Sequence, residues 1–479
     1  MSDSLKEKTG TALFWNFIDK GGQQVIQFIF VFVLARLLEP EEFGLVAILS
    51  IFSVIAYILQ DSGFSSALIR KKDVDEADYS SVFYFNLIIS ASIYLILFFC
   101  APFIADFYNM PILAPLSRVL FLTFFFFSLG IIQNVHLVRA MDFRTGVRIT
   151  FISGLASGCI AIWMAWSGYG VWSLVAQQVL QALFRSITLW LFVRWHPKTR
   201  MMMSKLKSMM SYSINILASA ILNQIAGNIY PTVIGKNFSM SQVGYYGQAS
   251  KLTTILQSII GASLQGVAYP VLSKIDEDER LKRALRKIIR ISSFICFPII
   301  TLLAVGAKPI VIIVLSDKFI ASVPIVQLLA IGAAVYPLYC VIHAYIQSIG
   351  ESRMLLKLEA FRSILSIGSI IITMQFGILA MVLGLSTANI IVFVTSVYIS
   401  GKRLSYTLTE AFKDIIPYVS ISVLVFFPLY FLNRIIGNDY ILLGLQTVIG
   451  LGLYLLIVKI LGSKVLEDCV EFFKSKKFK

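Results

Sequence analysis

The sequence predicts an all-α polytopic membrane protein with about 14 transmembrane helices. Of its 479 residues, 58% are hydrophobic and only 14% are charged, whereas a typical soluble domain carries roughly 25% charged residues. Apolar runs of about 20 residues, the length that crosses a bilayer, recur along the whole chain. No stretch reads as a separate water-soluble domain. No cleavable signal peptide is recognisable before the first span, which is therefore predicted to belong to the mature protein.

The apolar runs define 14 spans that are joined by short connections. The longest connection is the basic stretch from Trp195 to Met209, near the middle of the chain. The predicted spans are residues 12–35, 44–69, 80–104, 113–138, 148–168, 170–194, 210–235, 244–272, 288–314, 323–348, 356–375, 378–400, 415–433 and 439–461.

The distribution of Lys and Arg predicts the orientation of the spans. Alternate loops, beginning with the N-terminus, carry 32 of the cations, the opposite loops carry six, and three lie within spans. Loops rich in Lys and Arg stay in the cytoplasm, so both termini are predicted to be cytoplasmic. This topology, facing anionic lipid, explains the net charge of +15 without a nucleic-acid partner.

The chain also repeats itself at an offset near 200 residues. Matching positions, in order along the chain, are Gln23 and Asn223, Gln24 and Gln224, Arg36 and Lys236, Gly44 and Gly244, and Gly170 and Gly377. Each repeat holds six spans, an even number, so the two repeats share one orientation, as in transporters with parallel repeats. We predict an N-terminal lobe at residues 1–200, a C-terminal lobe at 201–405, and two extra helices with a basic cytoplasmic tail at 406–479.

The first span carries a polar face within an apolar helix. Its members are Asn16, Asp19, Lys20, Gln23, Gln24 and Gln27, which fall within an arc of roughly 140° at ~100° per residue. Lipid cannot solvate such a face. It either packs against other helices as polar glue or lines a hydrophilic cavity. The mixture of amides, carboxylate and ammonium favours the cavity.

Three further spans have polar faces. They contain Gln177, Gln178, Gln181, Arg185 and Thr188 in span 6, Asn215, Ser219, Asn223, Gln224 and Asn228 in span 7, and Gln248, Lys251, Ser258 and Gln265 in span 8. An ionisable residue within a span is a functional candidate by default. Lys20, Arg185 and Lys251 are therefore predicted to line the cavity. The alternative is snorkelling to the membrane surface, which is easiest for Lys251.

The spans contain few other residues that could bind ions or take part in catalysis. Asp19 and Asp61 are candidates for coupling to a proton or sodium ion, although a helix-breaking turn at residues 60–63 gives Asp61 an equally good structural role. Packing is favoured over a proton relay for His136 and His343. The five cysteines lack paired spacing, and the four in or beside apolar spans are predicted to pack in the core. No enzyme motif, metal site or cofactor site is recognisable.

Four segments carry a family resemblance. They are residues 34–44 (LARLLEPEEFG), 61–73 (DSGFSSALIRKKD), 168–178 (GYGVWSLVAQQ), and 317–319 (DKF) with Pro324. Taken in order, they resemble the polysaccharide-transport family of lipid-linked oligosaccharide flippases of the O-antigen type. That family belongs to the multidrug/oligosaccharidyl-lipid/polysaccharide exporter superfamily.

The resemblance implies two six-helix lobes around a central cavity in a bacterial inner membrane. It implies alternating access that moves an undecaprenyl-pyrophosphate-linked sugar unit, for O-antigen, capsule or exopolysaccharide, from the cytoplasmic to the periplasmic leaflet. Polysaccharide polymerase and chain-length machinery are then candidate partners. Lys20, Arg185 and Lys251 would bind the pyrophosphate, and the amides on the polar faces would bind the sugar.

The sequence also has to be compared with three alternative functions. A multidrug or small-molecule antiporter of the same superfamily would favour an acidic cavity, whereas the spans hold three cations and two carboxylates. A membrane-embedded polymerase or glycosyltransferase would need a large external loop, which the chain lacks. A purely structural scaffold leaves the polar faces unexplained.

Overall fold

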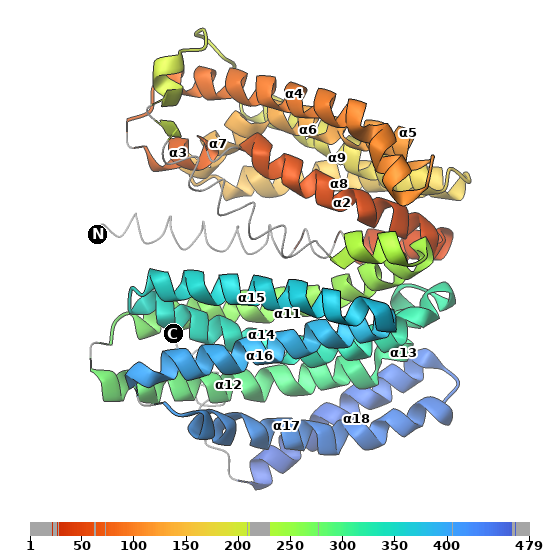
Figure 1. Cartoon of the computed structure of the whole chain (residues 1–479), viewed down its shortest axis with the longest axis vertical. Helices are drawn as coiled ribbons and strands as arrows, with labels where there is room; N and C mark the ends of the chain where they lie inside the picture. Colours follow the sequence, from red (N-terminus) through yellow and green to blue (C-terminus); the bar gives the residue numbers. More distant parts are fainter. Residues whose placement is uncertain are drawn as a thin grey trace. The chain divides into compact units, whose positions relative to one another are not determined.

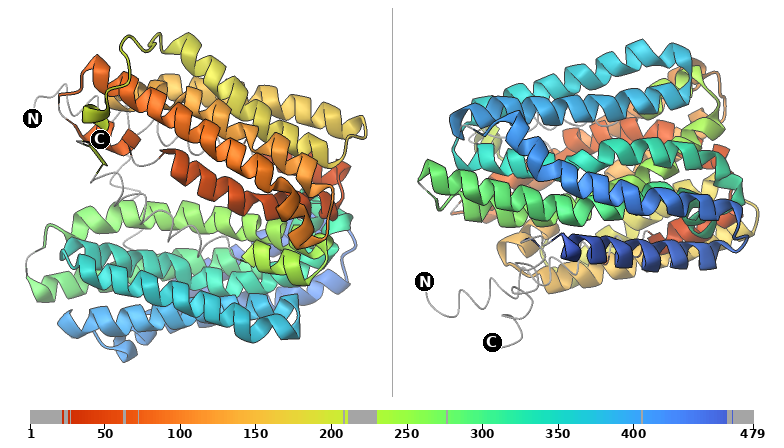
Figure 2. Two further views of the ribbon diagram at one scale, coloured as in Figure 1. Left: turned by 45° about the horizontal axis from the view of Figure 1, so that its top comes forward. Right: turned by 90° about the horizontal axis from the view of Figure 1, so that it is seen from below.

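The computed structural model describes residues 22, 26, 28–61, 64–71, 73–207, 209–210, 230–275, 277–404, 406–461 and 465. Within these residues the chain is helical and contains no strand, in agreement with the predicted all-α class (Figure 1). It divides into two compact units, unit 1 at residues 1–244 and unit 2 at residues 245–479. Figure 2 shows from two further sides that the long helices within each unit run side by side.

Unit 1 contains nine labelled elements, the last of which continues into unit 2. They are α2 (Pro40–Asp61), α3 (Phe64–Arg70), α4 (Glu76–Tyr108), α5 (Leu113–Leu120), α6 (Leu122–Leu129), α7 (Ile131–Arg139), α8 (Phe143–Trp166), α9 (Val171–Phe192) and the start of α11 (Met240–Leu272). Unit 2 adds α12 (Asp278–Val305), α13 (Ala307–Val314), η1 (Asp317–Ser322), α14 (Val323–Ser348), α15 (Ser352–Thr373), η2 (Met374–Phe376), α16 (Ile378–Leu404), α17 (Leu408–Tyr430), η3 (Phe431–Arg434) and α18 (Asp439–Ile460).

Many of these helices are long and apolar enough to cross a membrane. Across the described residues, eight helical segments are long and apolar enough to span, or nine if the bent pair formed by residues 113–129 and 131–139 counts as one span. Three further helices of 22 residues, α2, α9 and α15, overlap predicted spans. The protein is therefore a multi-pass membrane protein, and the count of 14 stays a prediction.

Most helices begin or end a few residues from the predicted bounds, and three predicted spans correspond to more than one α-helix. The span predicted at 44–69 corresponds to α2, which ends at Asp61, and α3, which begins at Phe64. Residues 113–138 form three helices rather than one, with breaks at Phe121 and Gly130 and a bend of 44° at the second break. Gly is a poor helix former, which accounts for the break at Gly130. The residues on either side are mostly apolar, so the hydrophobicity pattern did not indicate this break. The span predicted at 288–314 begins ten residues earlier, at Asp278, and Gly306 divides it into α12 and α13. Its early start follows from Leu, Lys, Arg and Ala, which favour helix even where the chain is charged.

Small residues allow close helix contacts inside each unit. In unit 1, a Cβ atom at Gly158 of α8 would overlap the ring of Phe30. In unit 2, a Cβ at Gly450 of α18 would overlap the ring of Phe426 of α17. Close approach of this kind stabilises helix pairs in lipid, where van der Waals contact replaces the hydrophobic effect. The two extra helices, α17 and α18, pack on α12 and on each other.

Two glycines allow α2 and the first turn of α11 to cross at contact distance within unit 1. A Cβ at Gly44 would overlap the carbonyl oxygen of Met240, and a Cβ at Gly244 would overlap the carbonyl oxygen of Pro40. We expect Gly244→Val to force the two backbones apart and to lower the free energy of unfolding by about 1–3 kcal/mol. Thermal unfolding of purified protein measures this. Gly266→Val, at a position on α11 with open space around it, is the control, and an equal loss in both variants would contradict the expectation.

Candidate functional site

A pocket of about 210 Å³ lies in unit 1 and is lined by residues of α3, α6, α7 and α9. It is lined by Ser65, Phe127, Gly130, Ile131, Asn134, Ala182, Arg185, Ser186 and Leu189. The side-chain oxygen of Ser65 is buried and has no hydrogen-bond partner among the residues that the structure describes. A buried hydroxyl without a partner loses its hydration free energy.

Arg185 is the charged residue of the pocket. Its side chain is half-buried, and Nη2 donates a hydrogen bond to Oδ1 of Asn134 at 3.5 Å. Within the described part of the chain, no carboxylate lies within ion-pair distance of Arg185. A guanidinium has five N–H donors, so most of its hydrogen-bonding capacity is open to an anion.

The break at Gly130 shapes the pocket. The carbonyl oxygen of Leu129, at the end of α6, accepts a hydrogen bond from Nε1 of Trp190 at 2.7 Å, which ties α6 to α9. A Cβ at Gly130 would lie 2.7 Å from Cδ1 of Leu189. The absence of a side chain therefore lets α7 approach α9 and brings Asn134 opposite Arg185.

The other polar residues of α9 are not equivalent. Gln177, Gln178 and Gln181 are half-buried, and Gln181 precedes Arg185 by about one turn. Thr188 is buried, and its hydroxyl donates to the carbonyl oxygen of Phe184 at 2.7 Å. Thr188 is thus satisfied by its own helix and does not extend the polar face.

Unit 2 contains the predicted residues Gln248 and Lys251, both on α11. Lys251 is exposed. The helix α11 begins at Met240, four residues before the predicted span. Lys251 therefore lies eleven residues, or ~16 Å, from the start of the helix, and not the seven residues that the sequence predicted. Gln248 is only 2% exposed, and its Oε1 has no hydrogen-bond partner in the described regions.

The remaining predicted residues cannot be placed. Those outside the described residues are Asn16, Asp19, Lys20, Gln23, Gln24, Gln27, Asn223 and Gln224. Asp61 is the last residue of α2, and its side chain is outside the description as well. Their assignment to the cavity and to ion coupling stays a prediction.

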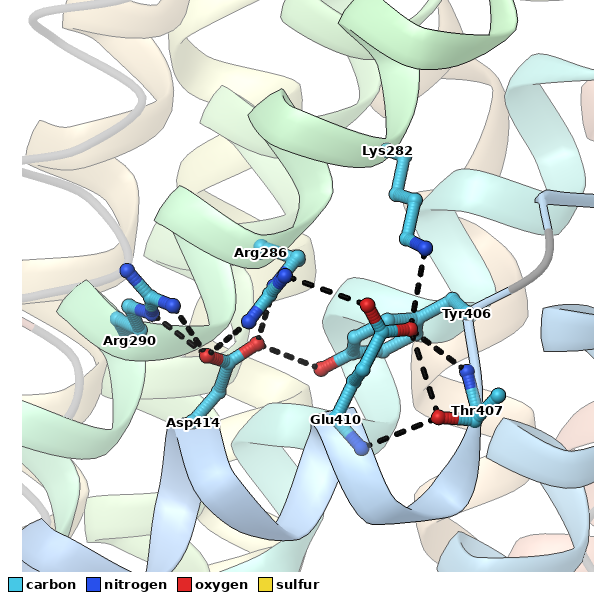
Figure 3. A network of polar contacts seen from close by, with 7 residues as sticks. All are labelled: Lys282, Arg286, Arg290, Tyr406, Thr407, Glu410 and Asp414. Carbon is cyan, nitrogen blue, oxygen red and sulfur yellow. Dashed lines mark hydrogen bonds and ion pairs between the residues drawn. The ribbon is translucent and has the colours of Figure 1, made fainter.

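An ionic network in unit 2 was missed from the sequence (Figure 3). Asp414 of α17 is 1% exposed on its side chain and binds two arginines of α12. Arg286 donates from Nε and Nη2 to the two carboxylate oxygens at 2.8 and 3.0 Å, and Arg290 donates from Nε to Oδ1 at 2.7 Å. The hydroxyl of Tyr406 donates to Oδ2 at 3.2 Å. Asp414 therefore fastens the first extra helix to α12.

Glu410 extends the same network by one turn. With Thr407 it forms a capping box at the start of α17, and its carboxylate lies 3.1 Å from Lys282 and 3.4 Å from Arg286. The sequence placed these cations in a loop. Two patterns in the sequence could have indicated this network. Glu410 and Asp414 are one helical turn apart, and so are successive members of the series Lys282, Arg286 and Arg290.

Unit 1 has an acidic cluster at the start of α4. Asp78 is fully buried and lies 2.6 Å from Lys71. Asp75 caps α4 by accepting the N–H of Asp78, and lies 2.5 Å from Lys205. Lys205, followed by the N–H of Asp78, stabilises the carboxylate and lowers the pKa of Asp75 to about 2. These contacts hold the basic connection against α4.

The two histidines within spans lie among aromatic side chains. The ring of His136 stacks on Tyr79 with centroids 4.2 Å apart, and His343 lies 6.0 Å from Tyr339. Tyr339 in turn donates to Glu359 at 2.7 Å, a carboxylate seven residues into α15 that sequence reasoning did not single out. These contacts agree with the packing role that was favoured for both histidines.

A family model described as "Polysaccharide biosynthesis protein" matches residues 33–324. The chain belongs to the polysaccharide biosynthesis protein family. The resemblance found in the sequence is thereby confirmed. Residues 33–324 include Arg185 and every other residue that lines its pocket, whereas Glu410 and Asp414 lie beyond the match.

Relatives of this protein have names from polysaccharide biosynthesis. It is 26% identical over 373 residues to the succinoglycan biosynthesis transport protein ExoT of Rhizobium meliloti (strain 1021), covering 77% of this chain and 75% of the relative. It is 27% identical over 314 residues to the teichuronic acid biosynthesis protein TuaB of Bacillus subtilis (strain 168), covering 65% of each. It is 21% identical over 403 residues to the lipopolysaccharide biosynthesis protein WzxC of Escherichia coli (strain K12), covering 83% and 82%.

The fold of this family member is shared with solved transporters. The lipid II flippase MurJ in an inward closed conformation superposes with a TM-score of 0.78 at 16% identity, covering 94% of this chain and 98% of MurJ. An inward-facing multidrug resistance MATE transporter of the MOP superfamily gives a TM-score of 0.65 at 17% identity, covering 80% and 94%. At these identities the likeness shows the fold alone.

Proposed function

We propose that this protein is a flippase that moves an undecaprenyl-pyrophosphate-linked oligosaccharide repeat unit from the cytoplasmic to the periplasmic leaflet of a bacterial inner membrane. The observation that carries the proposal is Arg185, a half-buried cation in a polar pocket with no carboxylate partner among the described residues. The repeat unit would serve O-antigen, capsule or exopolysaccharide synthesis. The names of ExoT, TuaB and WzxC support this substrate class.

The pocket suits a phosphate group. Guanidinium binds phosphate oxygens in a bidentate manner, and Asn134 and Ser65 add an amide and a hydroxyl to the lining of the pocket. In our proposal Lys20 and Lys251 join Arg185 as successive partners of the pyrophosphate during alternating access. The amides of Asn16, Gln23, Gln24, Gln27, Gln181, Asn223, Gln224 and Gln248 bind the sugar.

A multidrug or small-molecule antiporter is the second candidate, because a MATE transporter shares the fold. The Arg185 pocket argues against an organic cation, which the guanidinium would repel. Deletion of the gene, followed by analysis of lipid-linked intermediates, separates the two functions. A flippase predicts that the lipid-linked repeat unit accumulates on the cytoplasmic leaflet. Normal surface polysaccharide together with altered drug tolerance would favour the antiporter.

The proposed direction of transport requires both termini, and the loops with Lys71, Arg200 and Arg283, to be cytoplasmic. In a variant whose native cysteines are replaced, we expect a cysteine at exposed position 200 to resist a membrane-impermeant maleimide added to intact cells. A cysteine at exposed position 434, on the predicted outer side, should react and serves as the control. Reaction at 200 but not at 434 would reverse the orientation.

A further inference from the structure

Three polar side chains form a cluster in unit 2, where α14 and α15 pack against each other (Figure 1). The hydroxyl of Tyr339 on α14 donates to Oε1 of Glu359 on α15 at 2.7 Å. The other carboxylate oxygen, Oε2, lies 3.5 Å from Nη1 of Arg362, one turn further along α15. The guanidinium carbon of Arg362 lies 5.9 Å from the centre of the Tyr339 ring. A carboxylate, a guanidinium and a phenol are thus gathered at one place.

The cluster lies at membrane depth in both helices. Tyr339 precedes the end of α14 by nine residues, or ~14 Å, and Arg362 follows the start of α15 by ten residues, or ~15 Å. The side chains of Glu359 and Arg362 are nevertheless 29% and 37% exposed. Charged residues within membrane helices face the interior of the bundle or a water-filled cavity, because lipid does not solvate them. The open parts of these two side chains are therefore expected to face water or a polar ligand.

The charges in the cluster compensate each other. Glu359 pairs with Arg362, whereas Arg185 in unit 1 has no carboxylate within ion-pair distance among the described residues. A sugar hydroxyl is both a donor and an acceptor, so a carboxylate beside a guanidinium can satisfy both functions. The guanidinium has five N–H donors, and its contact with Glu359 uses only part of them. A phosphate group would be repelled by the carboxylate. The cluster therefore suits hydroxyl groups better than phosphate.

A further hydrogen-bonding group lies beside the cluster. His343 follows Tyr339 by one turn on α14, and the centres of the two rings are 6.0 Å apart. The Nδ1 atom of His343 is buried and has no hydrogen-bond partner among the described residues. A hydroxyl can satisfy this nitrogen in either tautomer, because a hydroxyl both donates and accepts.

We propose that Glu359 and Arg362 bind hydroxyl groups of the sugar in the lipid-linked repeat unit, and that Tyr339 is a positioning residue that orients the carboxylate of Glu359. This inference rests on the proposed function and assigns part of the glycan recognition to unit 2, whereas Arg185 in unit 1 binds the pyrophosphate. Discrimination among glycans would then depend on unit 2, because a site built to bind a hydroxyl strongly disfavours a substrate that lacks it.

Binding of two lipids to the purified full-length protein, measured by native mass spectrometry, tests the site. One lipid is undecaprenyl pyrophosphate, and the other is the same lipid with the repeat unit attached, extracted from the bacterium that encodes the protein. We expect Glu359→Gln and Arg362→Gln each to bind the repeat-unit lipid about 10- to 100-fold more weakly. Both variants should bind undecaprenyl pyrophosphate like wild type. Arg185→Gln should weaken binding of both lipids alike.

Glu277→Gln and Arg280→Gln are the matched controls. These two residues form an ion pair at the same spacing in the same unit, but their side chains are 60% and 72% exposed, so both variants should bind both lipids like wild type. Equal losses in the controls, or a folded Glu359→Gln that binds the repeat-unit lipid like wild type or loses both lipids equally, would overturn the sugar site and leave the flippase proposal standing. Wild-type protein that binds neither lipid would overturn the proposed function, and the sugar site with it.

A double-mutant cycle tests the role of Tyr339. Tyr339→Phe removes the hydroxyl that donates to Glu359 and should weaken binding of the repeat-unit lipid less than Glu359→Gln does. In the double variant it should cause no further loss, because Tyr339 acts only through the carboxylate. Glu359→Asp should retain part of the affinity. Thermal unfolding of each variant identifies loss of folding. If the two effects simply add in folded protein, or if Tyr339→Phe binds like wild type, Tyr339 does not position Glu359.

Discussion

Arg185→Gln is expected to reduce export of the lipid-linked repeat unit by about 10- to 100-fold, the range that corresponds to one lost set of charged hydrogen bonds, ~1.5–3 kcal/mol. The proposed pyrophosphate contact needs both the charge of Arg185 and its planar donors. Arg185→Lys should therefore restore only part of the activity, because it keeps the charge but not the bidentate geometry. Flipping in vesicles that contain the purified protein and a lipid-linked repeat unit measures this directly.

Folding should be nearly unaffected in these variants. Within the described part of the chain, the side chain of Arg185 makes one hydrogen bond, to Asn134, and this bond is long at 3.5 Å. Thermal unfolding should therefore change little. Arg148→Gln removes the same charge from an exposed position of α8 in the same unit and is the control. Unchanged export by folded Arg185→Gln would remove Arg185 from the proposed site, and loss of export in Arg148→Gln as well would point to bulk charge instead.

Asp414→Ala is expected to lower the free energy of unfolding by about 3–5 kcal/mol, the range found when one partner of a buried ion pair is removed. Arg286 and Arg290 would then face each other with only Glu410, 3.4 Å from Arg286, as a counter-charge, and the side chain of Arg286 is only 27% exposed. Thermal unfolding of the purified protein measures the loss.

A compensated variant separates loss of pairing from loss of volume. Asp414→Leu combined with Arg286→Met and Arg290→Met removes all three charges and should recover most of the stability, because apolar side chains can replace a buried ionic cluster. Asp317→Ala, an exposed carboxylate of η1, should change stability by less than about 0.5 kcal/mol. A triple variant as unstable as Asp414→Ala would show that packing, and not charge, attaches α17.

The all-α class and several spans could be predicted because a bilayer imposes both length and apolarity on a helix. The polar face of α9 was found for the same reason, since Arg185 contrasts with its apolar surroundings. The pocket beside Arg185 could not be predicted. It depends on the break at Gly130, and a glycine within an apolar run does not by itself reveal whether a helix continues or bends.

The ionic network was missed because charged residues next to an apolar run look like a loop. Lys282 and Arg286 occur in a segment too polar to be counted as a span, Arg290 lies at the very start of the span predicted at 288–314, and Asp414 immediately precedes another. Only the extension of α12 to Asp278 and of α17 to Leu408 brings these side chains opposite one another. Contacts between residues more than 120 positions apart are set by packing, which periodicity cannot reveal.

The crossing of Gly44 and Gly244 bears on how such a chain could originate. Pro40 meets Gly244 just as Met240 meets Gly44, four residues apart in each case. A contact in which each partner presents the same positions to the other is the type found at the two-fold axis of a homodimer. In the predicted repeat these positions correspond, and a duplicated half-length chain would produce such a contact. Residues 40–44 and 240–244 now have only their glycine in common, and glycine is the residue that so close a crossing requires.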